Sequence, residues 1–161
     1  MEITIREASD SDFEHVSAVF LDELVFHAEL LPNRFQLVDE TMTGEWFQEI
    51  VHNQEKEMIL AQLGPDVVGV LHFEMRTSPD LPFFVPRRYA HVSDIVVIRE
   101  HRFRGYGRFL MRRGISWANE RGASSIELHV WEQNKDPITF YDRLGFSVVQ
   151  RTMQFDLLTS Q

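Results

Sequence analysis

The chain has 161 residues and no cysteine, which excludes disulfides, thiolate metal sites and a cysteine nucleophile. Its hydrophobic share of 43% and charged share of 25% are typical of a soluble globular protein, and we expect one domain over residues 1–161. The formal net charge of -9 argues against a nucleic-acid partner and favours a cationic small molecule or a basic peptide.

The first half of the chain alternates between strand and helix patterns. Strands are predicted where apolar residues alternate or run together, at residues 2–7, 58–63 and 67–73. The last two flank Gly64-Pro65-Asp66 and predict a hairpin. Helices are predicted from a cap at Ser9 or Asp10 towards Pro32, and at about residues 39–52. Residues 76–88 are richer in proline and predict a loop.

The second half continues the alternation. Strands are predicted at residues 91–98, 125–131, 146–149 and 151–157, and helices at about residues 105–121 and 136–145. Gly122 and Gly145 follow the two helices in the position of a C-terminal cap. A parallel strand pair with a right-handed helical crossover is expected around the first of these helices.

A short basic turn joins the strand 91–98 to the next helix. Glycines at 105 and 107 let a ligand approach the backbone, and the unpaired N–H groups of a first helical turn attract anions. Arg102, Arg104 and Arg108 add positive charge. The alternative interpretation is that the glycines only permit a tight connection and that the arginines are solvated.

Two motifs resemble one known family. Arg102-Phe-Arg-Gly105-Tyr-Gly107 is similar to the Gln/Arg-x-x-Gly-x-Gly/Ala acyl-coenzyme A signature of the GNAT superfamily of N-acetyltransferases. The segment from Asn134 to Phe146 resembles the superfamily's later Asn-x-x-Ala-x-x-Phe-Tyr-x-x-x-Gly-Phe motif, and the element order extends the resemblance over nearly the whole chain. Arg99, Phe103 and Pro137 depart from the usual pattern, and none of them removes a needed backbone donor from the turn.

The resemblance implies an α/β fold with a mixed sheet of about seven strands, about four flanking helices and splayed central parallel strands. It also implies a binding site for acetyl-coenzyme A. The pyrophosphate would lie against the turn, which consists of Arg102, Phe103, Arg104, Gly105, Tyr106, Gly107 and Arg108. Backbone groups of Ile95, Val96 and Val97 would pair with the pantetheine arm and polarise the thioester carbonyl.

Two residues of the later motif receive roles by the same resemblance. Asn134 would contact the cofactor or orient the splayed segment, and the alternative is a loop or cap asparagine. Tyr141 would give a proton to the departing thiolate, and the alternative is a packed aromatic residue on a short amphipathic helix.

The residue that accepts the proton of the amine stays open. His91 and Asp94 interrupt one apolar strand, and Glu127 and His129 share one face of the next. Family members shape the acceptor pocket with their first two helices, so further candidates for lining the acceptor site are Glu23, His27 and Glu29. For each of these side chains the alternative is an exposed or internally satisfied polar group.

We therefore predict an acetyl-coenzyme A dependent N-acetyltransferase that acts on a primary amine of a small molecule, a polyamine or a peptide by direct transfer in a ternary complex. One alternative is an acyl-coenzyme A sensor without turnover. Another is a nucleotide-binding enzyme, although Gly-x-x-x-x-Gly-Lys-Ser/Thr is absent. A homodimer is expected from the superfamily.

Three absences complete the prediction. The seven histidines are scattered, so no metal is expected. The N-terminus lacks the pattern of a signal peptide, and no apolar stretch reaches roughly the 18 residues of a membrane span. A cytoplasmic protein without membrane attachment is therefore expected.

Overall fold

The structure, a computed structural model, describes residues 2–157 of the chain. These residues form two compact units, Met1–His129 and Val130–Gln161. The first unit contains the sheet and three of the helices, and the second contains one helix. None of the helices within residues 2–157 is both long and apolar enough to cross a membrane.

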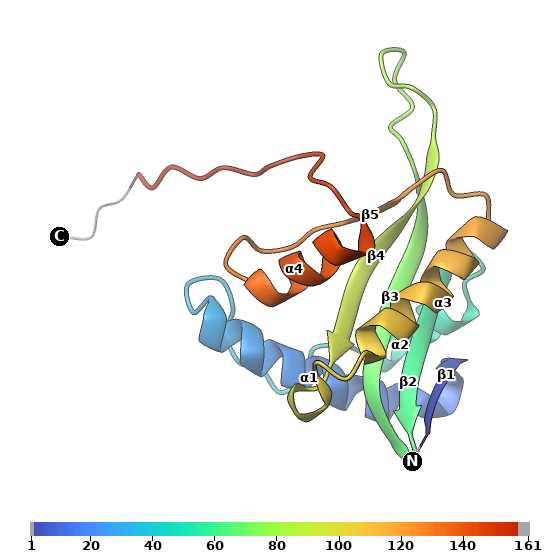
Figure 1. Ribbon diagram of the computed structural model, residues 1–161, viewed down its shortest axis with the longest axis vertical. Coiled ribbons are helices and arrows are strands. Elements are labelled where there is room, and N and C mark those ends of the chain that lie inside the picture. The colour runs from blue at the N-terminus through green and yellow to red at the C-terminus, as the bar shows by residue number, and fades with distance from the viewer. Residues whose placement is uncertain (1, 158–161) are drawn as a thin grey trace. The chain divides into compact units, whose positions relative to one another are not determined.

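One mixed sheet organises the first unit (Figure 1). Among the described residues its strands are β1 (Ile3–Glu7), β2 (Lys56–Leu63), β3 (Asp66–Thr77), β4 (Arg88–Val97) and β5 (Ile126–Leu128), which lie side by side in that order. The pairs from β1 to β4 are antiparallel, whereas β4 and β5 are parallel. The predicted α/β class, the hairpin and the parallel pair are therefore confirmed.

The helices of the first unit are α1 (Phe13–Leu30), α2 (Gly44–His52) and α3 (Tyr106–Glu120). Buried side chains from α1 and α2 pack together with Val70 and Val96 of the sheet. On the other face, α3 comes so close that a side chain at Gly114 would collide with Phe73 and Leu71. Because neighbouring residues of a strand point to opposite faces, β3 contributes alternately to both layers.

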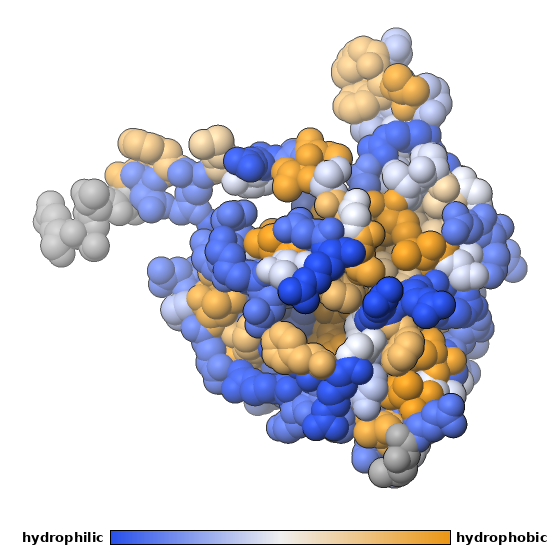
Figure 2. Space-filling model, viewed as in Figure 1, coloured by the Kyte–Doolittle hydropathy of each residue, from blue (hydrophilic) through white to orange (hydrophobic). Residues whose placement is uncertain are grey.

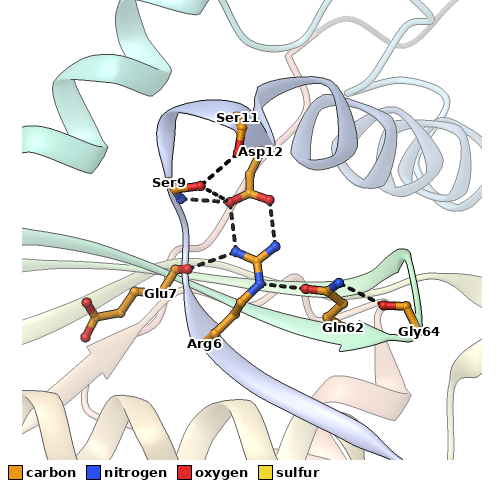
Figure 3. Close-up of polar contacts among 7 residues, drawn as sticks. All are labelled: Arg6, Glu7, Ser9, Ser11, Asp12, Gln62 and Gly64. Atoms are coloured by element: carbon orange, nitrogen blue, oxygen red, sulfur yellow. Dashed lines mark hydrogen bonds and ion pairs between the residues drawn. The ribbon is translucent and has the colours of Figure 1, made fainter. Parts of the chain in front are cut away.

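The start of α1 is tied to the sheet by a partly buried ion pair (Figure 3). Arg6 of β1 donates two hydrogen bonds of 2.8 and 2.7 Å to the carboxylate of Asp12, and its Nε donates to Gln62 of β2. The N–H and hydroxyl of Ser9 donate to the same carboxylate. These bonds hold the pKa of Asp12 far below its usual range, with the bond from Arg6 as the largest cause.

A bulge in the β3–β4 pair sets which side chains face α1 and α2. His72 pairs with Asp94, but the next residue, Phe73, pairs with Val92, so Ser93 has no residue opposite it. Phe73 faces α3. His72 and Asp94 therefore both point to the layer of α1 and α2.

The connection between β3 and β4 carries exposed apolar side chains at its tip, namely Leu81, Phe83 and Val85. In Figure 2 they form the orange group at the top. This tip lies at the opposite end of β4 from the turn that leads into α3.

Two predicted helix boundaries need correction. The second helix begins at Gly44 and not near residue 39, because Thr43 caps it by accepting a bond from the N–H of Trp46. The last helix, α4 (Lys135–Leu144), begins after Asn134, which occupies the N-cap position without a side-chain capping bond, and Pro137 is its third residue. An N–H there would have no partner inside the helix, so proline fits. The caps predicted at Gly122 and Gly145 are confirmed by their positive φ angles.

The sheet has fewer strands than the about seven that were expected. The predictions of strands at residues 146–149 and 151–157 were wrong, because neither segment is a strand in the structure. The predicted strand 125–131 is also shorter, since β5 ends at Leu128. Alternating apolar residues suit a strand, but a strand forms only where a neighbour offers hydrogen bonds, and periodicity does not reveal that neighbour.

Candidate active site in the first unit

The turn between β4 and α3 presents backbone donors. A short 3-10 helix (Arg99–His101) follows β4, after which Phe103 and Gly105 adopt positive φ angles of 61° and 85°. The N–H groups of residues 103–107 donate no hydrogen bond within the described part of the chain. The next two, of Arg108 and Phe109, bond to the carbonyl of Gly105. A row of unused donors at a helix start is suited to an anion.

The three arginines of the turn differ in their contacts and in their exposure. Arg102 turns back towards the sheet, where its Nε donates to the carbonyl of Val97 at 2.9 Å and its guanidinium lies 4.3 Å from the ring centre of Phe26. Arg104 and Arg108 are exposed, and neither forms an ion pair among residues 2–157. The positive charge available to an anion at the turn therefore comes from Arg104 and Arg108.

The edge of β4 next to this turn is open. β5 pairs with β4 only at Ala90, His91 and Val92, so residues 93–97 have no strand partner on that side within the described chain. On the other side, Ile95, Val96 and Val97 pair with residues 69–71 of β3. Their alternate backbone groups point away from β3 and remain available to a ligand in extended form. This early end of pairing agrees with the splayed strands expected from the resemblance.

Asp94 of β4 lies beside a histidine that the sequence did not single out. The Nδ1 of His72 on β3 is 3.4 Å from Oδ2 of Asp94. The His72 side chain is 4% exposed and that of Asp94 is 30% exposed. The Nε2 of His72 is buried and has no hydrogen-bond partner among the described residues, and the edge of the Trp46 ring packs against the imidazole. A polar residue in the apolar run of β3 was the signal that could have found His72.

Two residues of α1, Glu23 and His27, extend this group. Their closest charged atoms, Oε1 and Nδ1, are 3.9 Å apart. Burial, and next the charge of Asp94, raise the pKa of Glu23 to about 8. The pKa of His27 is lowered by burial and then by the charge of Arg102. At neutral pH this pair is therefore mainly uncharged.

His91 belongs to a different neighbourhood from Asp94. Its ring lies 5.3 Å from that of His129, and its pKa is lowered by burial first and then by Arg76 and His129. The neighbouring Glu127 forms an ion pair with Arg87. The sequence grouped His91 with Asp94 on one strand, and the structure does not bring them together.

The remaining sequence candidates are placed as follows. Glu29, near the end of α1, forms an exposed ion pair of 2.7 Å with Arg99. Asn134 and Tyr141 lie in the second unit, where Asn134 is the residue directly before α4 and makes no side-chain capping bond. The ring of Tyr141 packs against Phe140 and Phe146 at centre distances of 5.4 and 5.5 Å. No three His, Asp or Glu side chains within residues 2–157 are grouped as a metal ion would require.

A family model for the acetyltransferase (GNAT) family matches residues 23–146, which is more than half of the chain. The chain belongs to this family. The matched segment contains the open edge of β4, the turn and α4. The resemblance read from the two motifs is therefore confirmed.

Two further proteins are similar over most of this chain. An uncharacterized N-acetyltransferase, MJ1207 of Methanocaldococcus jannaschii, is 27% identical over 143 residues, which are 89% of this chain and 60% of that protein. The chain thus spans about three fifths of this relative's length. A mutant form of the BH1408 protein from Bacillus halodurans has a TM-score of 0.91 at 25% identity, over 96% of this chain and 99% of that one.

The GNAT fold of this chain is also that of an enzyme solved with a coenzyme A derivative. AAC(6')-Iy in complex with the bisubstrate analog CoA-S-monomethyl-acetylneamine has a TM-score of 0.72 at 15% identity, and the match covers 99% of this chain and 100% of that one. At this identity the likeness shows the fold alone.

Proposed function

We propose that this chain, as one N-acetyltransferase domain over residues 1–161, transfers an acetyl group from acetyl-coenzyme A to a primary amine, directly and within a ternary complex. The observation that carries the proposal is the row of unused N–H groups at residues 103–107, directly after the open edge of β4. A pyrophosphate fits such a row, and Arg104 and Arg108 match its charge.

Each element of the site then has a role. The N–H groups of residues 103–107 and the side chains of Arg104 and Arg108 hold the phosphates, whereas Arg102, which is bonded to the carbonyl of Val97, positions the turn. The backbone of Ile95, Val96 and Val97 binds the pantetheine arm and polarises the thioester carbonyl. Acetyl-coenzyme A supplies an activated acetyl group when it is bound. Asn134, which lies directly before α4, contacts the cofactor or orients the segment that follows β5.

Proton transfer is assigned to individual side chains. An amine must lose its proton before it attacks, and Asp94 is the acceptor that we propose, because its Oδ2 faces His72 and its side chain remains partly exposed. His91 is the second candidate for this role. Tyr141 gives a proton to the thiolate that leaves. No covalent enzyme intermediate is needed, in keeping with the absence of cysteine.

The test is acetyl transfer by the whole chain to a panel of amines, followed through the release of free coenzyme A thiol. Tyr141→Phe should lower kcat by about tenfold or more, while the Kd for coenzyme A changes less than about twofold. Tyr89→Phe, on β4, is the matched control and should leave kcat unchanged. Full turnover by Tyr141→Phe would remove the acid role, and binding of acetyl-coenzyme A without turnover of any amine would favour a sensor.

A further inference from the structure

Glu23 is a largely enclosed carboxyl group that forms no hydrogen bond with any residue from 2 to 157. Within the described residues the one basic nitrogen at ion-pair distance is Nδ1 of His27, at 3.9 Å. The Glu23 side chain is still 19% exposed, so that a small molecule can reach it. A carboxyl group in such a place lowers stability unless a partner compensates for its lost hydration.

The protein does not supply that compensation itself. Asp94 on β4 and Asp22 on α1 add negative charge near Glu23, and Arg102 is the positive group that opposes them. Arg102 is already engaged by the carbonyl of Val97 and by the ring of Phe26. His27 cannot neutralise Glu23 at neutral pH because burial disfavours its charged form. Within the described residues, Glu23 therefore has no charged partner at ion-pair distance at neutral pH.

Aromatic rings contact the two histidines that lie beside Glu23 and Asp94, namely His27 and His72. His27 stacks on Phe35 at 5.0 Å, the ring of the preceding residue, Phe26, lies 5.8 Å from that of His27, and Trp46 of α2 packs on His72. Rings beside carboxyl groups favour an organic cation, whose carbon atoms contact the rings while its charge meets the carboxylate.

We propose that Glu23 binds a second, non-reacting ammonium group of the acceptor, so that the preferred substrates carry at least two amino groups. This inference rests on the proposed function, in which the reacting amine lies at Asp94. Glu23 on α1 and Asp94 on β4 then hold the two ends of one acceptor. The arriving ammonium replaces the proton that Glu23 carries in the free protein.

The experiment compares α,ω-diaminoalkanes with n-alkylamines of the same chain length as acceptors for the whole protein. The wild type should prefer the diamine by about tenfold or more in kcat/KM at the best length, as expected for a charge-assisted hydrogen bond. Glu23→Gln should remove most of this preference while it changes kcat/KM for the monoamine by less than about threefold. Glu14→Gln, at an exposed position of α1, is the matched control and should keep the preference.

The outcomes separate the two proposals. Equal use of diamines and monoamines by the wild type, or an unchanged preference in Glu23→Gln, overturns the role of Glu23 and leaves the acetyltransferase proposal standing. If no amine is acetylated, the proposed function fails, and calorimetric titration with the diamines decides about Glu23. Weaker diamine binding by folded Glu23→Gln then supports the site, whereas equal binding overturns it.

Discussion

Asp94 and His72 are register partners on adjacent strands, and Oδ2 of Asp94 lies 3.4 Å from Nδ1 of His72. With its proton on Nδ1, His72 donates to this oxygen and leaves the other carboxylate oxygen for the acceptor amine. The imidazole itself is held by burial and by the ring of Trp46. This pairing exists because the bulge after His72 turns both side chains to the layer of α1 and α2.

Replacing the two partners should have graded effects. Asp94→Asn removes the proton acceptor and should lower kcat/KM by about a hundredfold or more. His72→Gln keeps a donor of similar reach and should lower kcat by about tenfold, with a shifted pH profile and little change in KM. Steady-state kinetics from pH 6 to pH 9 measure both effects, and wild-type kinetics in Asp94→Asn would show that another group accepts the proton.

The anion turn was predictable from sequence, whereas the group around Asp94 was only partly so. Glycines 105 and 107 and the basic residues mark the turn locally, and α3 begins next to the first glycine, as expected. His72 and Asp94 are 22 positions apart. Their contact depends on a bulge, which no local pattern announced. Glu23 was recognised as a candidate, but its burial depends on how α1 lies on the sheet.

The two segments predicted as C-terminal strands show that an alternating pattern alone does not establish a strand. Alternating apolar residues from Phe146 to Leu157 satisfy the local rule for strands, yet the structure has no strand there. Strand formation depends on a partner far away in sequence, whereas the caps at Thr43, Gly122 and Gly145 are local. The caps at Gly122 and Gly145, which need no distant partner, were therefore predicted more reliably than these strands.

Gly105 should be sensitive to substitution through its backbone. Its φ of 85° is strained for any other residue, although a side chain would meet open space. Gly105→Ala should cost about 1 to 2 kcal/mol of unfolding free energy and lower Tm by about 3 to 6 °C. We also expect weaker coenzyme A binding in titration calorimetry, because the N–H groups of the turn lose their alignment.

Gly44→Ala provides the control for this change. Gly44 also has open space around it, but it begins α2 without a positive φ. Alanine should therefore be neutral or slightly stabilising there. Equal Tm and equal affinity for coenzyme A in Gly105→Ala and Gly44→Ala would contradict the role of the turn's conformation.

The ion pair of Arg6 and Asp12 should stabilise the fold in a defined pH range. The folded-state pKa of Asp12 lies below its ordinary value of 3.8, so its contribution is present above that pH and is lost as the pH falls further. Asp12→Asn should lower the free energy of unfolding by about 2 to 4 kcal/mol at pH 7, because Arg6 loses its buried partner. Urea titrations at pH 7 and pH 3 should show this gap shrinking in acid.

The exposed carboxyl group of Asp10 serves as the comparison, since it pairs with the exposed His52. Asp10→Asn should cost less than about 1 kcal/mol. A loss in Asp12→Asn that is no larger than this, or one that does not depend on pH, would refute the stabilising role of the pair.

Glu23 should lower the stability of the fold as the pH rises, in contrast to Asp12. Its pKa rises from 4.5 to about 8 on folding, so the folded chain binds the proton more tightly and loses stability as the pH rises through this window. The slope from this group is at most about 1.4 kcal/mol per pH unit. Glu23→Gln cannot ionise, so its Tm should fall less between pH 5 and pH 8 and exceed that of the wild type at pH 8. Parallel Tm curves for the two proteins would mean that Glu23 is ionised in the fold.

The most direct test of the central claim is mass spectrometry of the products formed from acetyl-coenzyme A and a diamine panel. An N-acetyltransferase forms the N-acetylated amine and free coenzyme A in equal amounts, and the wild type should do so with at least one member of the panel. Coenzyme A release without an acetylated amine, or bound acetyl-coenzyme A that persists with every amine, would contradict the account.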